Sequence, residues 1–290
     1  MRFVFIRAHA RIYHITTMCR VLEVSRAGYY AWCARPLSAR VQADALLSAR
    51  IRAIHEQVQR RYGSPRVHQE LKALGLPCGK HRVARLMREG GLRARRARRY
   101  RVTTQSAHRE PVAPNVLARQ FALTTHPTLN HTWAADLTYL PTREGWLYLA
   151  VVLDLASRRV VGWALRTRLD HPLALAALEM ALAHRGAPPQ LHHSDRGLQY
   201  ASLAYQRLLR RVGATVSMSR AGDCWDNAVV ESFFATLRKE LVPADGFATR
   251  AEASRAVFAF IEIWYNRQRR HSTLGYRSPA EFEDQLAHVS

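Results

Sequence analysis

Residues 146–155 form an almost continuously apolar run, and this run constrains the fold of the chain more than any other segment. Its first eight residues carry no charge and do not alternate between apolar and polar side chains. A strand with one face in water alternates in this way, whereas a strand buried on both faces reads as a continuous apolar stretch. The run therefore predicts a strand that is buried on both faces of its sheet.

The segments around this run alternate between strand-like and helix-like patterns. No internal repeat is visible in the 290 residues. The element order is three strands, followed by helix, strand, helix, strand and helix. This is the order of a ribonuclease-H-like α/β core, which we expect over residues 126–290. The expected strands are 131–140, 146–155, 159–165, 190–193 and 214–218, and the expected helices are about 172–184, 201–211, 226–240 and 251–266, the last two completing the chain.

Positive charge is concentrated in the first 110 residues. They contain 24 Lys and Arg against 6 Asp and Glu, a net charge of +18, whereas residues 111–290 contain 20 against 16, a net charge of +4. Most of the basic residues are arginines, whose planar guanidinium group suits phosphate. A generally arginine-rich composition does not account for this asymmetry, so we expect the N-terminal part to bind a polyanion, DNA or RNA.

Residues 44–92 have the pattern of a small helical DNA-binding domain. Apolar residues recur at helical spacing in three stretches, and Ser64 followed by Pro65 is expected to cap and begin the second helix. The third helix, about 80–88, is basic on a second side, which is the layout of a helix-turn-helix module. This side is either a DNA-contacting surface, which we favour, or the solvated face of an ordinary bundle. Its basic residues are Lys80, Arg82, Arg85 and Arg88. The expected inner faces are Leu47, Ile51, Ile54 and Val58, then Val67, Leu71 and Leu74, then Val83, Leu86 and Met87.

Two further regions flank this module. Residues 1–43 are expected to be a helical segment, in which residues 14–33 read as two short helices around a tight turn: half of a helix-turn-helix, or a small aromatic cluster. Residues 93–101 contain six arginines in nine positions, which a core cannot bury. Residues 93–125 are therefore expected to be a basic linker that lies along phosphates. The linker arginines expected to contact DNA are Arg95, Arg96, Arg98 and Arg99.

Three acidic residues fall where such an α/β core could use them. Asp136 lies in the middle of the first expected strand, where a charge is costly unless it is paired or bound to a metal. Asp195 follows the short strand 190–193, at the edge where open α/β sheets bind ligands. Glu231 lies on the helix 226–240, among apolar residues that pack this helix on the sheet. The first and fourth strands are neighbours in this topology, so the three carboxylates can share one site.

Three carboxylates suit magnesium, a hard cation that prefers oxygen ligands. Two such ions about 3.5–4 Å apart can activate an attacking oxygen and stabilise the leaving oxygen of a phosphodiester. We therefore expect two Mg²⁺ ions, for which Mn²⁺ can substitute, held by Asp136, Asp195 and Glu231.

The spacing and the surrounding sequence blocks resemble a known family. Between Asp195 and Glu231 lie 35 residues, as in the D…D(35)E signature of retroviral integrases and related transposases. The blocks WAADLTY (133–139), HSDRGLQY (193–200) and DCWDNAVVESFF (223–234) are similar to those of this family, as are residues 62–63 with the helices after them and the ending 264–276. The likeness covers nearly the whole chain and is closest to bacterial insertion-sequence transposases whose catalytic core is the second of two overlapping reading frames.

The resemblance implies an enzyme that cleaves DNA at the ends of a mobile element and transfers the 3′ strand into another phosphodiester. It implies that Asp136, Asp195 and Glu231 are the catalytic metal ligands. It also points to DNA contacts by three basic residues outside the N-terminal module. Arg238 is on nearly the same helical face as Glu231, although a helix-end cation favoured by the helix dipole explains it equally well. The other two, Arg267 and Arg270, lie in the ending.

Three polar residues beside the acids have two interpretations each. His193 and Ser194 are expected either to order the metal-binding loop or to form hydrogen bonds at the end of a strand. Asn227 is expected either to cap the helix of Glu231 or to touch the substrate.

The expected partners are double-stranded DNA, as element ends and as target, and further copies of the chain assembled on it. Relatives usually gain terminal-repeat recognition and a leucine zipper from an upstream reading frame, and no sustained apolar heptad occurs here. An upstream-frame transposase subunit or fusion is therefore also expected. With no run near bilayer length and four scattered cysteines, we expect a bacterial cytoplasmic protein associated with the nucleoid. The alternatives are a non-catalytic DNA-binding regulator that retains the fold and a ribonuclease-H-like nuclease.

Overall fold

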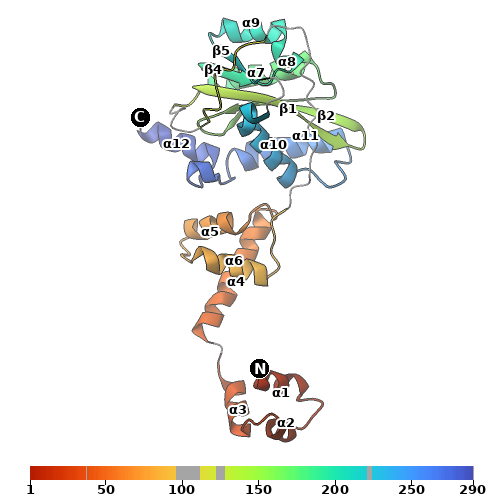
Figure 1. The fold of residues 1–290 in the computed structure, drawn as a ribbon, viewed down its shortest axis with the longest axis vertical. Helices are drawn as coiled ribbons and strands as arrows, with labels where there is room; N and C mark the ends of the chain where they lie inside the picture. The colour runs from red at the N-terminus through yellow and green to blue at the C-terminus, as the bar shows by residue number, and fades with distance from the viewer. Residues whose placement is uncertain (37, 96–111, 122–127, 221–223, 290) are drawn as a thin grey trace.

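The structure is a computed structural model that describes residues 1–36, 38–95, 112–121, 128–220 and 224–289. A three-helix unit at the N-terminus, a second three-helix module and an α/β core follow one another along the molecule (Figure 1). The predicted fold class, an α/β core preceded by an all-α region, is confirmed. The predicted boundaries of the four segments, at residues 43, 92 and 125, stay a prediction.

The N-terminal unit consists of α1 (Arg2–His9), α2 (Ile15–Val21) and α3 (Arg26–Ala34). The helices α2 and α3 are the two short helices expected in residues 14–33, and Ser25 Oγ caps α3 by accepting a hydrogen bond from the amide of Gly28. The helix α1 lies within the predicted helical segment 1–43, but its bounds are not predicted, because it has neither a capping side chain nor an acidic first turn. The unit packs around Ile6, Met18, Cys19 and Tyr29.

The second module contains α4 (Ala39–Gln57), α5 (Ser64–Ala73) and α6 (Lys80–Glu89), which are the three expected helices. Two details of the prediction are wrong. Gly63, not Ser64, is the N-cap residue of α5. Leu74 lies just beyond the end of α5 and is 61% exposed, so it is not part of the inner face. The other expected inward residues are in the core, with Leu47 partly buried.

The core is built on one five-stranded sheet with the strand order β3-β2-β1-β4-β5. The strands β1 (Thr132–Thr142), β2 (Gly145–Asp154) and β3 (Val160–Arg166) are antiparallel neighbours, and β4 (Leu191–Ser194) and β5 (Thr215–Met218) run parallel to β1. Antiparallel strands can be joined by tight turns, whereas the return to β4 needs a crossover, which α7 (His171–Arg185) supplies. The bounds of all five strands agree with the predicted ranges within two residues.

Helices cover both faces of the sheet, as the apolar run in β2 predicts. The helices α7, α8 (Leu198–Ala201) and α9 (Leu203–Arg211) lie over one face, and α10 (Ala228–Glu240) and α11 (Arg250–Phe258) lie over the other (Figure 1). Successive residues of β2 alternate between these faces: Val151 packs in the cluster on the α10 side and Val152 in the cluster on the α7 side. At Gly162 the approach of α7 is so close that a Cβ atom would overlap the carbonyl oxygen of Ala177.

Beyond α11 the chain continues through a π-helical segment (Ala259–Tyr265), the 3-10 turn Ser272–Leu274 and α12 (Pro279–Val289). The prediction that the helix 251–266 completes the chain is therefore wrong. A capping box begins α12: Glu281 accepts a hydrogen bond from the amide of Ser278, and the Ser278 hydroxyl accepts one from the amide of Glu281.

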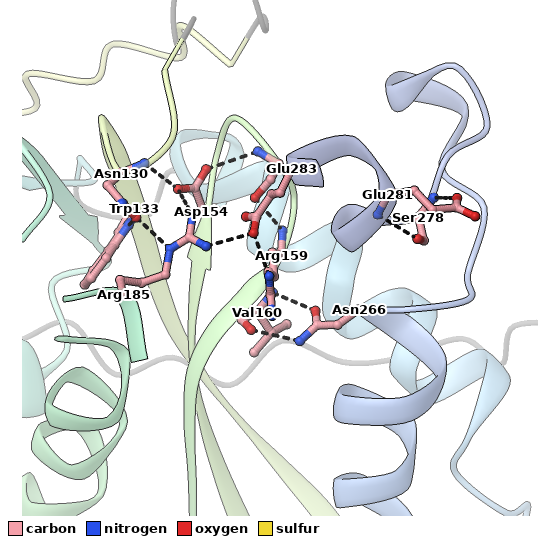
Figure 2. A network of polar contacts seen from close by, with 11 residues as sticks. Asn130, Trp133, Asp154, Arg159, Val160, Arg185, Asn266, Ser278, Glu281 and Glu283 are labelled. Atoms are coloured by element: carbon pink, nitrogen blue, oxygen red, sulfur yellow. Dashed lines mark hydrogen bonds and ion pairs between the residues drawn. The ribbon is translucent and has the colours of Figure 1, made fainter. Parts of the chain in front are cut away.

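A buried polar network ties α12 to the sheet (Figure 2). The carboxylate of Glu283 accepts hydrogen bonds from Arg159 at 2.6 Å and from Arg185 at 2.8 Å. Arg185 also lies 3.4 Å from Asp154, whose side chain is fully buried at the end of β2. These four charged groups neutralise one another at the edge where β2 ends and β1 begins.

The second module packs directly against the core. The Tyr62 side chain is fully buried, its ring centroid lies 5.3 Å from that of Trp264, and its hydroxyl accepts a hydrogen bond from the amide of Arg270 at 2.8 Å. Arg270 pairs with Glu70 at 2.6 Å, and Arg66 donates a hydrogen bond to the carbonyl of Arg270 at 2.8 Å. One hydrophobic cluster consequently extends from α4–α6 into the core.

No helix in the part of the chain that the structure describes is long and apolar enough to cross a membrane. Cys19, Cys33 and Cys78 are free thiols.

Candidate active site

Asp136 lies in the interior of β1, opposite Val151 of β2. On its other side β1 pairs with β4, and the register places Ala135 beside Ser194. The amide of Leu137 donates a hydrogen bond to Asp136 Oδ1 at 2.7 Å, which fixes the carboxylate against its own strand. The position next to the end of β4 is therefore the one predicted from the strand order.

Asp195 is the first residue after β4. Its Oδ1 accepts a hydrogen bond from the amide of Gly197 at 2.9 Å. A Cβ atom at Gly197 would stand 3.0 Å from that same oxygen, so the absence of a side chain at this residue lets the turn close around the carboxylate. Asp195 thus projects from the carboxyl end of a parallel strand, where α/β sheets bind ligands.

Glu231 lies in the first turn of α10 and is half-buried. Neighbouring apolar residues of the same helix are buried against the sheet, and this packing sets the direction in which the glutamate points. They are Val230, Phe233, Phe234 and Leu237.

The three carboxylates are close enough to affect one another electrostatically. Burial, followed by the charges of Asp195 and Glu231, raises the pKa of Asp136 well above its ordinary value, and Arg238 opposes this shift. Burial also raises the pKa of Glu231, and Arg238 again acts against it. The structure therefore brings the three predicted acids and Arg238 into one electrostatic neighbourhood.

The chemistry of this donor set fits a divalent cation. Among the described residues, no three His, Cys, Asp or Glu side chains are gathered tightly enough to form a preassembled metal cage. The carboxylates nevertheless repel one another in a partly buried place, and a hard cation with oxygen ligands relieves that repulsion.

The predicted supporting residues have structural partners. His193 is buried between two hydroxyls, with Nδ1 2.8 Å from Ser217 Oγ and Nε2 3.2 Å from Ser219 Oγ, and burial lowers its pKa to about 4. The Ser194 hydroxyl donates to the carbonyl of Asp195 at 3.0 Å. Asn227 occupies the N-cap position of α10, but its side chain makes no capping hydrogen bond and instead donates to the carbonyl of Ala135 at 3.1 Å.

Asp226 is a buried residue close to the candidate site in sequence, and it was not predicted as a site residue. Its carboxylate accepts hydrogen bonds from Asn115, Arg119 and Arg220. Its position inside the block 223–234, one residue before Asn227, is the signal that the sequence contained.

The four basic residues predicted on one side of α6 differ in exposure and pairing. Lys80 and Arg88 are exposed, whereas Arg82 and Arg85 each lie 2.6 Å from the carboxylate of Asp44 on α4, and Arg85 also pairs with Glu89. Of the linker arginines, Arg95 donates a hydrogen bond to the carbonyl of Glu240 at 2.9 Å. The others, Arg96, Arg98 and Arg99, lie outside the described residues.

The ending of the chain has mainly structural contacts. Arg270 is held by Glu70, and Arg269, which the sequence groups with Arg267 and Arg270 as a basic cluster, is buried against Glu240. Arg267 is exposed. The roles predicted for these residues in binding DNA stay predictions.

Comparison with solved structures finds retroviral integrases. The HTLV-2 integrase catalytic core domain in complex with magnesium (trimeric form) matches with a TM-score of 0.39 at 16% identity, covering 53% of this chain and 95% of that one. The simian T-cell lymphotropic virus intasome in complex with PP2A regulatory subunit B56 gamma matches with a TM-score of 0.43 at 17% identity, covering 79% of this chain and 73% of that one.

Family models and curated relatives match far more closely. Integrase core domain models match residues 126–224 and 212–279, and an HTH-like domain model matches residues 42–100. The insertion element IS600 31 kDa protein of Shigella sonnei is 44% identical, over 92% of this chain and 97% of that protein. Transposase InsF for insertion sequence IS3A of Escherichia coli (strain K12) is also 44% identical, over 98% of this chain and 99% of the relative. The chain therefore belongs to the insertion-sequence transposases of the IS3 family, enzymes of the polynucleotidyl-transferase type with an integrase core.

Proposed function

We propose that Asp136, Asp195 and Glu231 are the catalytic carboxylates of this transposase and that they act with a divalent cation on the ends of the insertion sequence. The observation that carries the proposal is the convergence of three acids from β1, the end of β4 and α10 into one electrostatic neighbourhood. Neither a non-catalytic regulator nor a ribonuclease-H-like nuclease has an observation in its favour.

The three acids would hold Mg²⁺, two ions in the favoured arrangement, with Mn²⁺ able to substitute. When bound, the metal supplies charge stabilisation of the attacking and leaving oxygens of a phosphodiester. The chain's own contribution is rigid placement, because each acid is attached to a different packed element. The oxygen of water attacks phosphorus and the bond to the 3′ oxygen breaks, which leaves a 3′-hydroxyl on one product and a 5′-phosphate on the other. That hydroxyl then attacks a phosphodiester of the target, so that a new P–O bond joins the two DNAs and the target strand's own 3′ oxygen leaves as a hydroxyl.

The test uses the full chain, labelled element-end DNA and Mg²⁺ or Mn²⁺. In Asp136→Asn, Asp195→Asn and Glu231→Gln we expect cleavage and joining to fall to the level without metal, while duplex affinity is retained. Asp284→Asn, at an exposed position of α12, is the matched control and should cleave normally. Normal cleavage by Asp195→Asn would remove Asp195 from the mechanism.

We also infer that the exposed side of α6 and the basic linker bind double-stranded DNA. Lys80 and Arg88 face solvent, whereas Asp44 neutralises Arg82 and Arg85. Because each released counterion contributes to the salt dependence, Lys80→Ala/Arg88→Ala should weaken binding and reduce the slope of log K against log salt by about one to two. Asp44→Asn, which removes the carboxylate paired with Arg82 and leaves Arg85 with Glu89 alone, should strengthen DNA binding. An unchanged slope in the first variant would mean that this side of α6 is only solvated surface.

The remaining partners follow from the same proposal. Two element ends and a target must be held together during strand transfer, so several copies of the chain are expected to assemble on DNA. Incubation with and without an upstream-frame subunit, on labelled ends, tests whether that subunit or its fusion is required.

A further inference from the structure

We propose that Asp226 is a positioning residue, whose buried carboxylate fixes the start of α10, and with it Glu231, to the segment through which the chain enters the catalytic core. The inference rests on the proposed function, because it takes Glu231 to act at the reaction centre. Asp226 lies five residues before Glu231, in the 3-10 helix Cys224–Asn227 (η2) that leads into α10.

The carboxylate of Asp226 is completely buried and accepts five hydrogen bonds. Oδ1 accepts from Arg119 Nε at 2.8 Å and from Arg220 Nη2 at 3.0 Å. Oδ2 accepts from Asn115 Nδ2 at 2.8 Å and from the amide and Nε of Arg220 at 2.9 and 3.0 Å. These partners hold the pKa of Asp226 well below its usual range, so the group stays ionised and bound to them.

The donors come from two segments that are themselves anchored. Asn115 and Arg119 lie in residues 112–121, a part of the predicted linker 93–125 that precedes the sheet. The amides of Val116 and Leu117 donate to Ser217 Oγ of β5 at 3.0 and 3.1 Å, so this segment is attached to the edge strand. Arg220 follows the end of that same strand.

Asn227, the residue after Asp226, extends the network to the strand of Asp136. Asn227 donates to the carbonyl of Ala135, the residue immediately before Asp136 in β1. Asp226 and Asn227 therefore connect the glutamate helix both to the incoming chain and to the strand of Asp136. A shift of the incoming segment is transmitted to the separation between Glu231 and Asp136.

Glu283 offers a matched control, because it is another buried carboxylate held by two arginines, and it lies at the edge where β2 ends (Figure 2). The full chain is prepared as Asp226→Asn and Glu283→Gln. For each we would measure the thermal midpoint, the affinity for Mn²⁺ alone by electron paramagnetic resonance, and kcat and KM for cleavage of labelled element-end DNA.

Both variants should have a lower thermal midpoint. Only Asp226→Asn should bind Mn²⁺ more weakly and lose kcat, with KM for DNA unchanged. The expected loss of kcat is about 10²-fold, the effect of a displacement on the order of 1 Å at a catalytic group. A merely structural role would leave the Mn²⁺ affinity and the kcat of the folded fraction at the wild-type level, which would overturn the inference. Equal losses of kcat in Glu283→Gln would overturn it as well.

If Asp226→Asn does not fold, Arg119→Gln and Arg220→Gln replace it. Arg220 contributes two side-chain hydrogen bonds and Arg119 one, so kcat should fall further in Arg220→Gln, and wild-type kcat in both variants would contradict the proposal. Asp195→Asn and Glu231→Gln are run in parallel. If these retain metal-dependent cleavage, the proposed function fails; if they lose it while Asp226→Asn cleaves normally, only the positioning role fails.

Discussion

The buried ion pair between Glu240 and Arg269 permits a quantitative prediction about how α10, the helix that carries Glu231, is anchored. Glu240 ends α10, nine residues after Glu231. Its carboxylate accepts hydrogen bonds from Arg269 Nη2 at 2.9 Å and from Trp264 Nε1 at 3.0 Å. The two charged side chains are only 2% and 6% exposed, so neither has water to replace a lost partner.

Arg269→Met leaves the Glu240 carboxylate buried with the Trp264 indole as a hydrogen-bond donor, and Glu240→Met leaves the Arg269 guanidinium without its carboxylate. Each single change should therefore destabilise the chain by about 3–5 kcal/mol. The double variant removes both charges and leaves mainly the indole N–H without its acceptor. Its cost should be about 1–3 kcal/mol, well below the sum of the single changes.

The assay is urea unfolding of all four members of the cycle, supported by thermal unfolding. For a chain of this size a single variant should lose about 2–4 °C in midpoint for each kcal/mol. The reasoning would be refuted if the double variant lost as much as the two single variants together, or if Arg269→Met stayed within about 0.5 kcal/mol of the wild type.

Three further predictions concern other parts of the molecule. Tyr62→Phe removes the acceptor for the buried amide of Arg270 and should cost about 1–3 kcal/mol in urea unfolding; no change would mean that the two units are not coupled through this hydroxyl. Gly162→Ala places a methyl group against the Ala177 carbonyl and should cost at least about 1–3 kcal/mol, measured by the thermal midpoint, and a midpoint equal to that of the wild type would contradict the close packing of α7. Burial and neighbouring arginines lower the pKa of His271 to about 2, so below about pH 6.5 the unfolded chain takes up a proton that the folded chain does not. The free energy of unfolding should therefore decrease as the pH decreases below about 6.5, by up to about 1.4 kcal/mol per pH unit from this group. His271→Gln should flatten the plot of unfolding free energy against pH, and an identical slope would assign the effect to other groups.

The parts of the fold that depend on local pattern could be predicted from the sequence. The run 146–155 predicted a strand buried on both faces, because such a strand has a continuous apolar sequence, and β2 is such a strand. The three helices of the second module were predictable because Ile51, Val67 and Val83 repeat with neighbours at helical spacing. The candidate acids were chosen by their places inside one strand, after the end of another and on a helix, all three of which follow from the element order.

The parts that depend on distant partners could not be predicted. The ion pairs of Arg82 and Arg85 with Asp44 form only because the fold brings α4 beside α6, and the predicted DNA contacts of these two arginines stay predictions. The partners of Asp226 include Asn115, which is 111 residues earlier in the chain, and no spacing rule connects them. In contrast, α12 could have been predicted, because Ser278 and Glu281 have the spacing of a capping box.

The close packing of α4–α6 on the core has a consequence for the spacing, along the DNA, between the sequence that the helical module would bind and the bond that would be cleaved. Because Tyr62 is buried at this junction, the module and the three candidate acids are held at one separation. In the proposed complex, that separation corresponds to a set number of base pairs between the bound sequence and the cleaved bond. Insertions of half a helical turn, about 5 base pairs, would rotate the scissile phosphate to the far side of the duplex, whereas a full turn of about 10 would restore its facing.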